Sequence, residues 1–440
     1  MRNIELGIDT FGDVTVDEDG HPLPQAQVIR NVVEEAALAD SLGLDAFGLG
    51  EHHRPDFAVS APDVVLAAIA ARTERIRLGS AVTVLSSDDP VRVFQRFSTI
   101  DAVSGGRAEV TLGRGSFTES FPLFGQDLAD YEVLFEEKLD LFVQLLREEP
   151  VTWSGTTRSA LRDQLVYPRT EGGLRAWVGV GGSPESVIRA ARHGLPLMLA
   201  IIGGDPVRFA PFADLYRQAL AELGQDPQPI GIHSPGHVAD TDEQARDEYW
   251  PHYRAMHASI GRDRGWPEMS RAQFDAAAGP NGALAVGSPE TVARKVIRSL
   301  DALGATRYSL KYSAGTLPHP LMMGSIERFA TEVVEPVVGR KVPIVPIRAV
   351  VGILHHRRLL HAGLDFISQA RAEPCHCRHV PDQQHRTRGN CHRPSPLARL
   401  VLRPVVIGVL CHVDAPGGSG SITAQSAHAP REPRRPEWNR

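Results

Sequence analysis

Short apolar stretches recur along most of the chain and alternate with longer segments of helical periodicity. Eight of these stretches have the length of a buried strand, and they cover residues 4–9, 45–50, 76–84, 108–112, 176–180, 197–202, 230–238 and 307–312. Between most of them apolar residues recur every three or four positions, which predicts amphipathic helices. Strands and helices in alternation imply parallel strands joined by right-handed crossovers. Eight such strands favour a closed (β/α)8 TIM barrel over an open doubly wound sheet.

Two segments interrupt this alternation. Residues 150–170 suit a small hairpin or another excursion, and residues 240–282 are polar and rich in Trp, Tyr and His. We interpret the second segment as an irregular helical insertion. The periodic pattern ends near Val338. The predicted organisation is therefore a barrel over residues 1–338, followed by a different kind of segment over residues 339–440.

Charge and cysteine content separate the same two parts of the chain. The 440 residues carry a formal net charge of -6. Residues 1–340 hold 32 Lys and Arg against 47 Asp and Glu, whereas residues 341–440 hold 15 against 6. So acidic a barrel is no nucleic-acid-binding surface. All four cysteines lie after residue 340, so disulfides contribute nothing to the barrel.

The segment 339–440 is basic and rich in Arg, His, Pro and Cys. Its Cys375–His379 stretch, CHCRH, together with Cys391 and His392, could be interpreted as a zinc site, but the spacing matches no standard zinc finger. We expect a disordered basic tail. The composition favours an alternative even more, which is that this segment was never selected to fold with the barrel. Translation of GC-rich DNA in a shifted reading frame would give such a sequence.

No part of the sequence has the pattern of a membrane or secretion segment. No apolar run reaches the roughly 18 residues that a spanning helix needs. The first residues, MRNIELGIDTFGD, lack a charged segment followed by an apolar core. We therefore expect a cytoplasmic protein without a membrane partner.

The second predicted strand leads into a run of polar residues, DAFGLGEHHRPDF, at positions 45–57. Catalytic loops follow barrel strands in this way, although a surface loop with chance histidines has the same pattern. His52 and His53 are adjacent and point to opposite sides of an extended segment, so at most one of them faces a site. We expect no metal, because the first 338 residues contain no HxxH, HxH or distant carboxylate cluster. A single histidine that faces the site suits proton transfer or hydrogen bonding.

A glycine-rich turn, GVGGSPES at positions 179–186, follows a strand and opens a helix. Gly181 and Gly182 let backbone N–H groups approach an anion, and Ser183 can cap the helix. The pattern predicts a phosphate site, and it lacks the third glycine of a dinucleotide fingerprint. A near copy, GSPET at 287–291, shows that the motif can also be nothing more than a well-capped helix.

Arg114 lies between two glycines at the end of the fourth predicted strand. A guanidinium there can hold a phosphate through two hydrogen bonds. The alternative is a structural ion pair with one of the many acidic residues.

These motifs resemble the bacterial luciferase-like flavin-dependent oxidoreductases, a family of single (β/α)8 barrels. The likeness rests on LGLDAFGLGEHHRPDF, on RIRLGSAVTVLSSDDPVRVFQRFSTIDAVSGGRAEVTLGRGSF and on VGVGGSPESVIRAARHGLPL, which occur in the family's order. It covers residues 1 to about 338 and says little about the substrate.

Carried over by position, the resemblance places catalytic and cofactor-binding roles on individual residues. It implies that His52 lies beside the flavin ring and that Ala81 and Val82 form a cis peptide beneath it. Arg114, Gly182 and Ser183 would bind the FMN phosphate. Gly113 stands where luciferase has a reactive cysteine, so light emission is not implied.

The resemblance implies an FMN-dependent monooxygenase that uses reduced FMN and oxygen on a small organic substrate. A separate NAD(P)H-dependent reductase would supply the reduced FMN, and the family often forms homodimers. The reaction needs a dry barrel mouth. Phe117, Phe121 and Phe124 could wall that mouth, unless they are ordinary core aromatics. The alternatives are a deazaflavin F420-dependent oxidoreductase, for whose acidic tail the barrel offers no basic groove, and a flavin-binding protein without turnover.

Overall fold

The computed structural model describes residues 4–17, 19–115 and 117–339. They belong to the first of two units into which the chain divides, residues 1–347 and 348–440. Apart from Gly339, the predicted tail with its Cys375–His379 stretch lies outside the described residues.

Eight parallel strands close into a barrel, which confirms the predicted fold class. In the order of their pairing around the barrel, the strands are β1 (Glu5–Thr10), β2 (Ala46–Leu49), β3 (Arg77–Ser80), β5 (Ala108–Gly113), β8 (Arg175–Val180), β9 (Leu197–Ala200), β10 (Ile230–Val238) and β12 (Arg307–Lys311). Pairing of β12 with β1 closes the circle. A short strand β4 (Thr83–Val84) continues β3 along β5.

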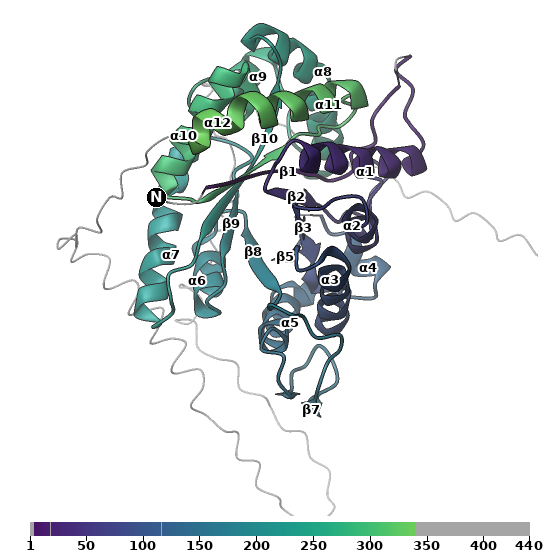
Figure 1. Ribbon diagram of the computed structural model, residues 1–440, viewed down its shortest axis with the longest axis vertical. Helices are drawn as coiled ribbons and strands as arrows, with labels where there is room; N and C mark the ends of the chain where they lie inside the picture. Colours follow the sequence, from purple (N-terminus) through teal and green to yellow (C-terminus); the bar gives the residue numbers. More distant parts are fainter. Residues whose placement is uncertain (1–3, 18, 116, 340–440) are drawn as a thin grey trace, which may run out of the picture. The chain divides into compact units, whose positions relative to one another are not determined.

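Helices surround the strands and cover them from outside (Figure 1). They are α1 (Gln25–Ser41), α2 (Pro62–Ala70), α3 (Pro90–Ser104), α5 (Tyr131–Leu145), α6 (Pro184–Arg192), α7 (Ala210–Glu222), α10 (Pro289–Leu303), α11 (His319–Arg328) and α12 (Val334–Val338). Several begin where Pro follows a capping side chain, as at Asp89, Ser183 and Ser288. Proline suits the first helical position because its missing N–H would have no partner there.

All eight predicted strands are present, with ends shifted by a few residues. The predicted strand 76–84 is divided between β3 and β4, and the peptide bond between Ala81 and Val82 is cis. The excursion at 150–170 contains the expected hairpin, made of β6 (Val151–Trp153) and β7 (Leu161–Gln164).

The insertion is more regular than we predicted, because it contains a continuous 23-residue helix, α8 (Asp242–Arg264). Its polar surface hides the periodicity, but Tyr249 and Tyr253 are four residues apart and pack on Phe274 of α9 (Arg271–Ala278). We also did not predict the strand β11 (Ala285–Gly287), which pairs with the end of β10. Three residues are too few to show a period.

Ionic side chains fill the N-terminal end of the barrel, away from the strand ends that carry the predicted site. Arg307 donates to Glu109 at 2.5 Å, and both side chains are 4% exposed. Arg175 and Arg307 also lie over the ring of the buried Trp177. Burial alone would raise the pKa of Glu109, but Arg307 and Arg175 lower it below the ordinary value.

We predict that Glu109→Gln lowers the free energy of unfolding by about 3 kcal/mol, because it leaves the Arg307 charge buried without its partner. Glu290→Gln is the matched control, since its pair with Arg294 spans 3.5 Å between side chains that are 88% and 66% exposed, and such pairs contribute little. Urea unfolding of both variants measures the difference. Equal small effects would show that the buried pair does not support the barrel.

Candidate functional site

The predicted site residues gather at one end of the barrel. His52 follows β2, Ala81 and Val82 follow β3, Arg114 follows β5, and Gly181–Ser183 follow β8. Because all eight strands are parallel, their C-terminal ends form a single rim. We call this end the mouth.

Three phenylalanine rings enclose His52 at the mouth. The ring centroids of Phe11, Phe57 and Phe117 lie 4.7, 4.4 and 5.2 Å from that of His52. Burial among these rings lowers the pKa of His52 to about 3, although Asp13 acts in the opposite direction. The imidazole is therefore neutral at ordinary pH and can form hydrogen bonds without carrying charge.

His53 has different neighbours from His52. Its Nε2 lies 3.0 Å from Glu51 Oε1, and Glu51 Oε2 accepts a hydrogen bond from the Val84 N–H at 2.9 Å. His53 and Glu51 therefore tie the loop after β2 to β4. Their role is to hold the loop that presents His52.

The cis peptide lies in a space that two glycines keep open. A Cβ on Gly113 would lie 2.5 Å from a Val82 methyl group, and a Cβ on Gly179 would lie 2.8 Å from the other. No larger residue fits either position without displacing Val82. A cysteine at position 113 would therefore conflict with Val82.

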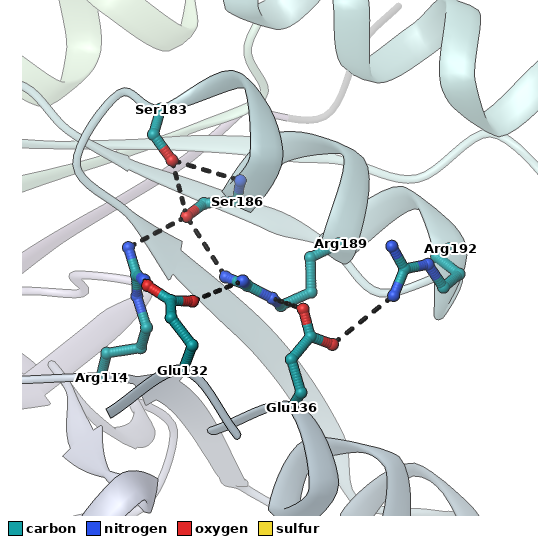
Figure 2. Close-up of polar contacts among 7 residues, drawn as sticks. All are labelled: Arg114, Glu132, Glu136, Ser183, Ser186, Arg189 and Arg192. Carbon is teal, nitrogen blue, oxygen red and sulfur yellow. Dashed lines mark hydrogen bonds and ion pairs between the residues drawn. The ribbon is translucent and has the colours of Figure 1, made fainter. Parts of the chain in front are cut away.

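Hydroxyl and guanidinium groups converge at the N-terminus of α6 (Figure 2). Ser183 caps the helix by accepting from the Ser186 N–H, and its hydroxyl lies 2.9 Å from the Ser186 hydroxyl. Arg114 and Arg189 each donate to the Ser186 hydroxyl at 3.3 Å. Gly182 has a φ of 107°, which favours glycine and turns the chain into the helix.

Acidic residues from α5 hold the two guanidinium groups in place. Glu132 pairs with both Arg114 and Arg189, and Glu136 pairs with Arg189 and Arg192 (Figure 2). The Arg189 side chain is only 6% exposed. Arg114 was predicted either to bind a phosphate or to form a structural ion pair. It forms an ion pair with Glu132, and it also donates to Ser186 at the N-terminus of α6.

Ser186 and Arg189 were not among the residues that we singled out from the sequence. Both lie on α6, three residues apart, so they share one helical face with the capping Ser183. The three-residue spacing of Ser183, Ser186 and Arg189 is visible in the sequence, and it could have predicted that these side chains lie close together.

The near copy of the motif, at the start of α10, shows how the same turn binds an oxyanion. Asp242 accepts hydrogen bonds there from the Ser288 N–H at 2.7 Å, the Ser288 hydroxyl at 2.9 Å and the Thr291 hydroxyl at 3.0 Å. A protein carboxylate therefore occupies this second helix N-terminus. At the first one, no carboxylate accepts from Ser183 or Ser186 among the described residues.

The loop after β5 covers the mouth together with the insertion. Phe117 contacts His52, and Arg54 lies over the Phe117 ring at 4.7 Å. Arg54 also pairs with Asp56, with Glu119 of the loop and with Asp263 of α8. Phe124 contacts His53, whereas Phe121 is buried against Tyr131. Two of the three predicted wall residues thus meet the histidine loop, and the third is a core residue.

The group of potential metal ligands found among the described residues, Asp17, Asp19 and His21, is exposed and includes no residue of the predicted site. Within the described part of the chain, no helix combines the length and apolarity needed to cross a membrane.

Comparison with known proteins assigns the family. The family model described as luciferase-like monooxygenase matches residues 10–307, so the chain belongs to this family.

Curated relatives share about a third of the aligned residues. The chain is 30% identical over 252 residues to 4-hydroxyprotoasukamycin monooxygenase of Streptomyces nodosus subsp. asukaensis, an alignment that covers 53% of this chain and 67% of that protein. It is 32% identical over 224 residues to limonene 1,2-monooxygenase of Rhodococcus erythropolis, with 50% and 57% covered. An uncharacterized Sinorhizobium fredii protein, y4wF, is 31% identical over 181 residues, and the alignment covers 41% of this chain and only 52% of y4wF.

Solved structures share the fold. Monooxygenase RslO1 from Streptomyces bottropensis has a TM-score of 0.65 at 24% identity, with 75% of this chain and 98% of that chain covered. The oxygenating constituent of 3,6-diketocamphane monooxygenase from Pseudomonas putida, in complex with FMN, has a TM-score of 0.61 at 19% identity, with 75% and 98% covered. An F420-dependent secondary alcohol dehydrogenase has a TM-score of 0.59 at 18% identity, with 77% and 100% covered.

The low pKa of His52 predicts how stability depends on pH. Between the ordinary value of 6.5 and about 3, the unfolded chain binds a proton at His52 and the folded protein does not. Stability that is present above pH 6.5 is therefore lost as the pH falls through this window. We expect His52→Gln to lose less stability than the wild type on acidification, measured by urea unfolding at successive pH values. His21→Gln, at a side chain that is 78% exposed, should behave as the wild type does; coincident curves for all three would contradict the burial of a neutral His52.

Proposed function

We propose that the mouth binds FMN and that the protein is an FMN-dependent monooxygenase acting with reduced FMN and oxygen on a small organic substrate. The observation that supports this most directly is the pairing of two different sites on one rim. One is an anion site at α6, and the other is an aromatic pocket around a neutral His52. In the order of the sheet, the cis peptide after β3 lies between them.

The groups at α6 fit a phosphate. Ser183, Ser186, Arg114 and Arg189 offer hydroxyl and guanidinium donors, and the helix N-terminus adds its positive dipole. The carboxylate of Asp242 on the equivalent groups of α10 supports this assignment, because it has the same oxygen chemistry. A bound phosphate would compete with Glu132 for both guanidinium groups.

The groups around His52 fit a flat ring. Phe11, Phe57 and Phe117 supply apolar surface, and the glycines at 113 and 179 keep side chains other than Val82 out of the space between. When bound, reduced FMN supplies the electrons that activate oxygen. A neutral His52 donates or accepts one hydrogen bond there, and the Arg54 contacts hold Phe117 in place to exclude water.

The monooxygenase relatives agree with this proposal, but an F420-dependent reaction is a second candidate. Two of the structural neighbours are F420-dependent proteins, and the fold is the same. A two-component system would need a separate NAD(P)H-dependent flavin reductase as partner. Because members of the family often form homodimers, we also propose that this protein is a homodimer. A flavin-binding protein without turnover is the third candidate, which the assays below separate.

We predict that Arg114→Ala and Arg189→Ala each weaken FMN binding about 10- to 100-fold, because each removes charge-assisted hydrogen bonds to the phosphate. Riboflavin, which has no phosphate, should bind these variants as it binds the wild type. Fluorescence titration with both flavins measures the two affinities. Arg192→Ala is the control, since that side chain is 44% exposed and pairs with Glu136 at 3.5 Å. A parallel loss of both flavins would mean that the arginines support the fold and not the phosphate.

We predict that His52→Ala lowers turnover by about 10²-fold, the scale of losing one transition-state hydrogen bond, with little change in FMN affinity. Oxygen consumption with FMN, a flavin reductase and a panel of aldehydes and alkanes measures turnover. In a parallel series without the reductase, F420 replaces FMN, alcohols are added to the panel, and the absorbance of F420 reports its reduction. His193→Ala, which follows α6 at the opposite end of the barrel, serves as control. FMN binding without turnover on any substrate would favour the non-catalytic alternative, and turnover with F420 alone would overturn the choice of cofactor.

A further inference from the structure

A second histidine stands at the mouth with a carboxylate behind it. His233 Nδ1 lies 2.9 Å from Asp9 Oδ2, across the strand β12 that separates β1 from β10. Two side chains that meet over an intervening strand must both point to the same face of the sheet, and both are buried inside the barrel. His233 is paired with Ala200, the last residue of β9, so it lies level with the rim.

This pair leaves two polar atoms without a partner. Asp9 Oδ1 is buried and accepts no hydrogen bond, and Asp9 as a whole is only 2% exposed. His233 Nε2 has no partner among the described residues either. Buried polar atoms are nearly always satisfied, so Asp9 Oδ1 can accept a hydrogen bond from a molecule bound at the mouth.

Two other carboxylates at the same end of the barrel, those of Asp13 and Glu35, accept hydrogen bonds through both oxygens. Asp13 accepts from Lys311, from the Ser313 hydroxyl and from the Gly315 N–H. Glu35 accepts through both oxygens, from Tyr312 and from His319. Those two carboxylates hold structure together. Among these three, only the Asp9 carboxylate has an oxygen that accepts no hydrogen bond.

The pair faces the aromatic pocket already described. The Phe11 ring stacks on His233 at 5.8 Å with an interplanar angle of 12°. The same ring also contacts His52, Phe57 and the Lys311 ammonium group. Stacking covers a face of the imidazole, and its edge keeps Nδ1 on Asp9 and Nε2 open to a bound molecule. A carboxylate at Nδ1 favours the tautomer in which Nε2 carries the lone pair. His233 can then accept a proton, which the enclosed His52 does not readily do.

We propose that His233, oriented by Asp9, is a proton-accepting residue for an aromatic or enolic hydroxyl group of the substrate, an inference that rests on the proposed function. The substrate O–H bond breaks, its electron pair stays on oxygen, and the proton moves to Nε2. The resulting imidazolium faces the Asp9 carboxylate. Deprotonation makes the substrate more electron-rich, and the phenylalanine rings of the mouth suit a flat substrate.

The test uses 4-nitrophenol as probe, because its phenolate form absorbs at longer wavelength than its neutral form. The full chain with FMN is titrated with the probe at a pH at which free 4-nitrophenol is mostly neutral. We expect the bound probe to show the phenolate spectrum. His233→Asn should abolish that spectrum, and Asp9→Asn should weaken it. His319→Asn, which also removes a carboxylate-paired histidine but lies on α11, is the matched control and should leave it unchanged.

Two outcomes would overturn the proposal. One is a wild-type protein that shows no phenolate spectrum at saturating probe, and the other is the same spectrum in wild type and His233→Asn. Circular dichroism and FMN affinity, both expected to match the wild type, identify a variant that has merely misfolded. In that case His233→Ala, which leaves room for added imidazole, decides the matter. Imidazole should restore the phenolate spectrum, and no restoration overturns the proposal. A wild type that neither binds FMN nor turns over substrate would instead count against the proposed function. The probe spectrum needs no turnover and is recorded with and without FMN, so the two failures are distinguished.

Discussion

Closure of the parallel sheet between β1 and β12 is the constraint on which the rest of the structure depends. Parallel pairing sends the C-terminal ends of all eight strands to one rim. Residues as far apart in the chain as His52, Arg114 and Ser183 become neighbours of one opening for that reason alone. The same closure brings Asp9 and His233 together across β12.

The two ends of the barrel use ionisable residues differently. At the N-terminal end, arginines and glutamates pair with one another around Trp177, and their charges are matched inside the protein. At the mouth, by contrast, His52 and Asp9 are not paired with opposite charges in this way. His52 is held uncharged by aromatic rings, and Asp9 keeps a free oxygen. In (β/α)8 barrels, catalytic residues usually lie at the C-terminal ends of the strands, the end called the mouth here.

The two GSPE motifs show how one local sequence acquires two roles. Both cap a helix with a serine followed by proline, and both present the same backbone and hydroxyl donors. At α10 the carboxylate of Asp242 occupies those donors, whereas at α6 two guanidinium groups converge on Ser186. The motif is the same at both helices, and the difference lies in the side chains that the fold places beside it. A carboxylate makes the turn at α10 a structural cap, and two guanidinium groups make the turn at α6 a candidate phosphate site.

The sequence by itself determined the strand count, the alternation of strand and helix, and the positions of the loops that carry His52, Arg114 and Ser183, because periodicity and turn residues are local properties. Ala81 and Val82 came from the family resemblance, and the cis peptide is present there. The sequence did not reveal the regular helix α8, whose apolar face is narrow, or the short strand β11. Only the tertiary structure decided that Arg189 joins Arg114 at Ser186 and that Asp9 meets His233. Those contacts join residues up to 224 positions apart, and no local pattern encodes which side chains meet across a closed barrel.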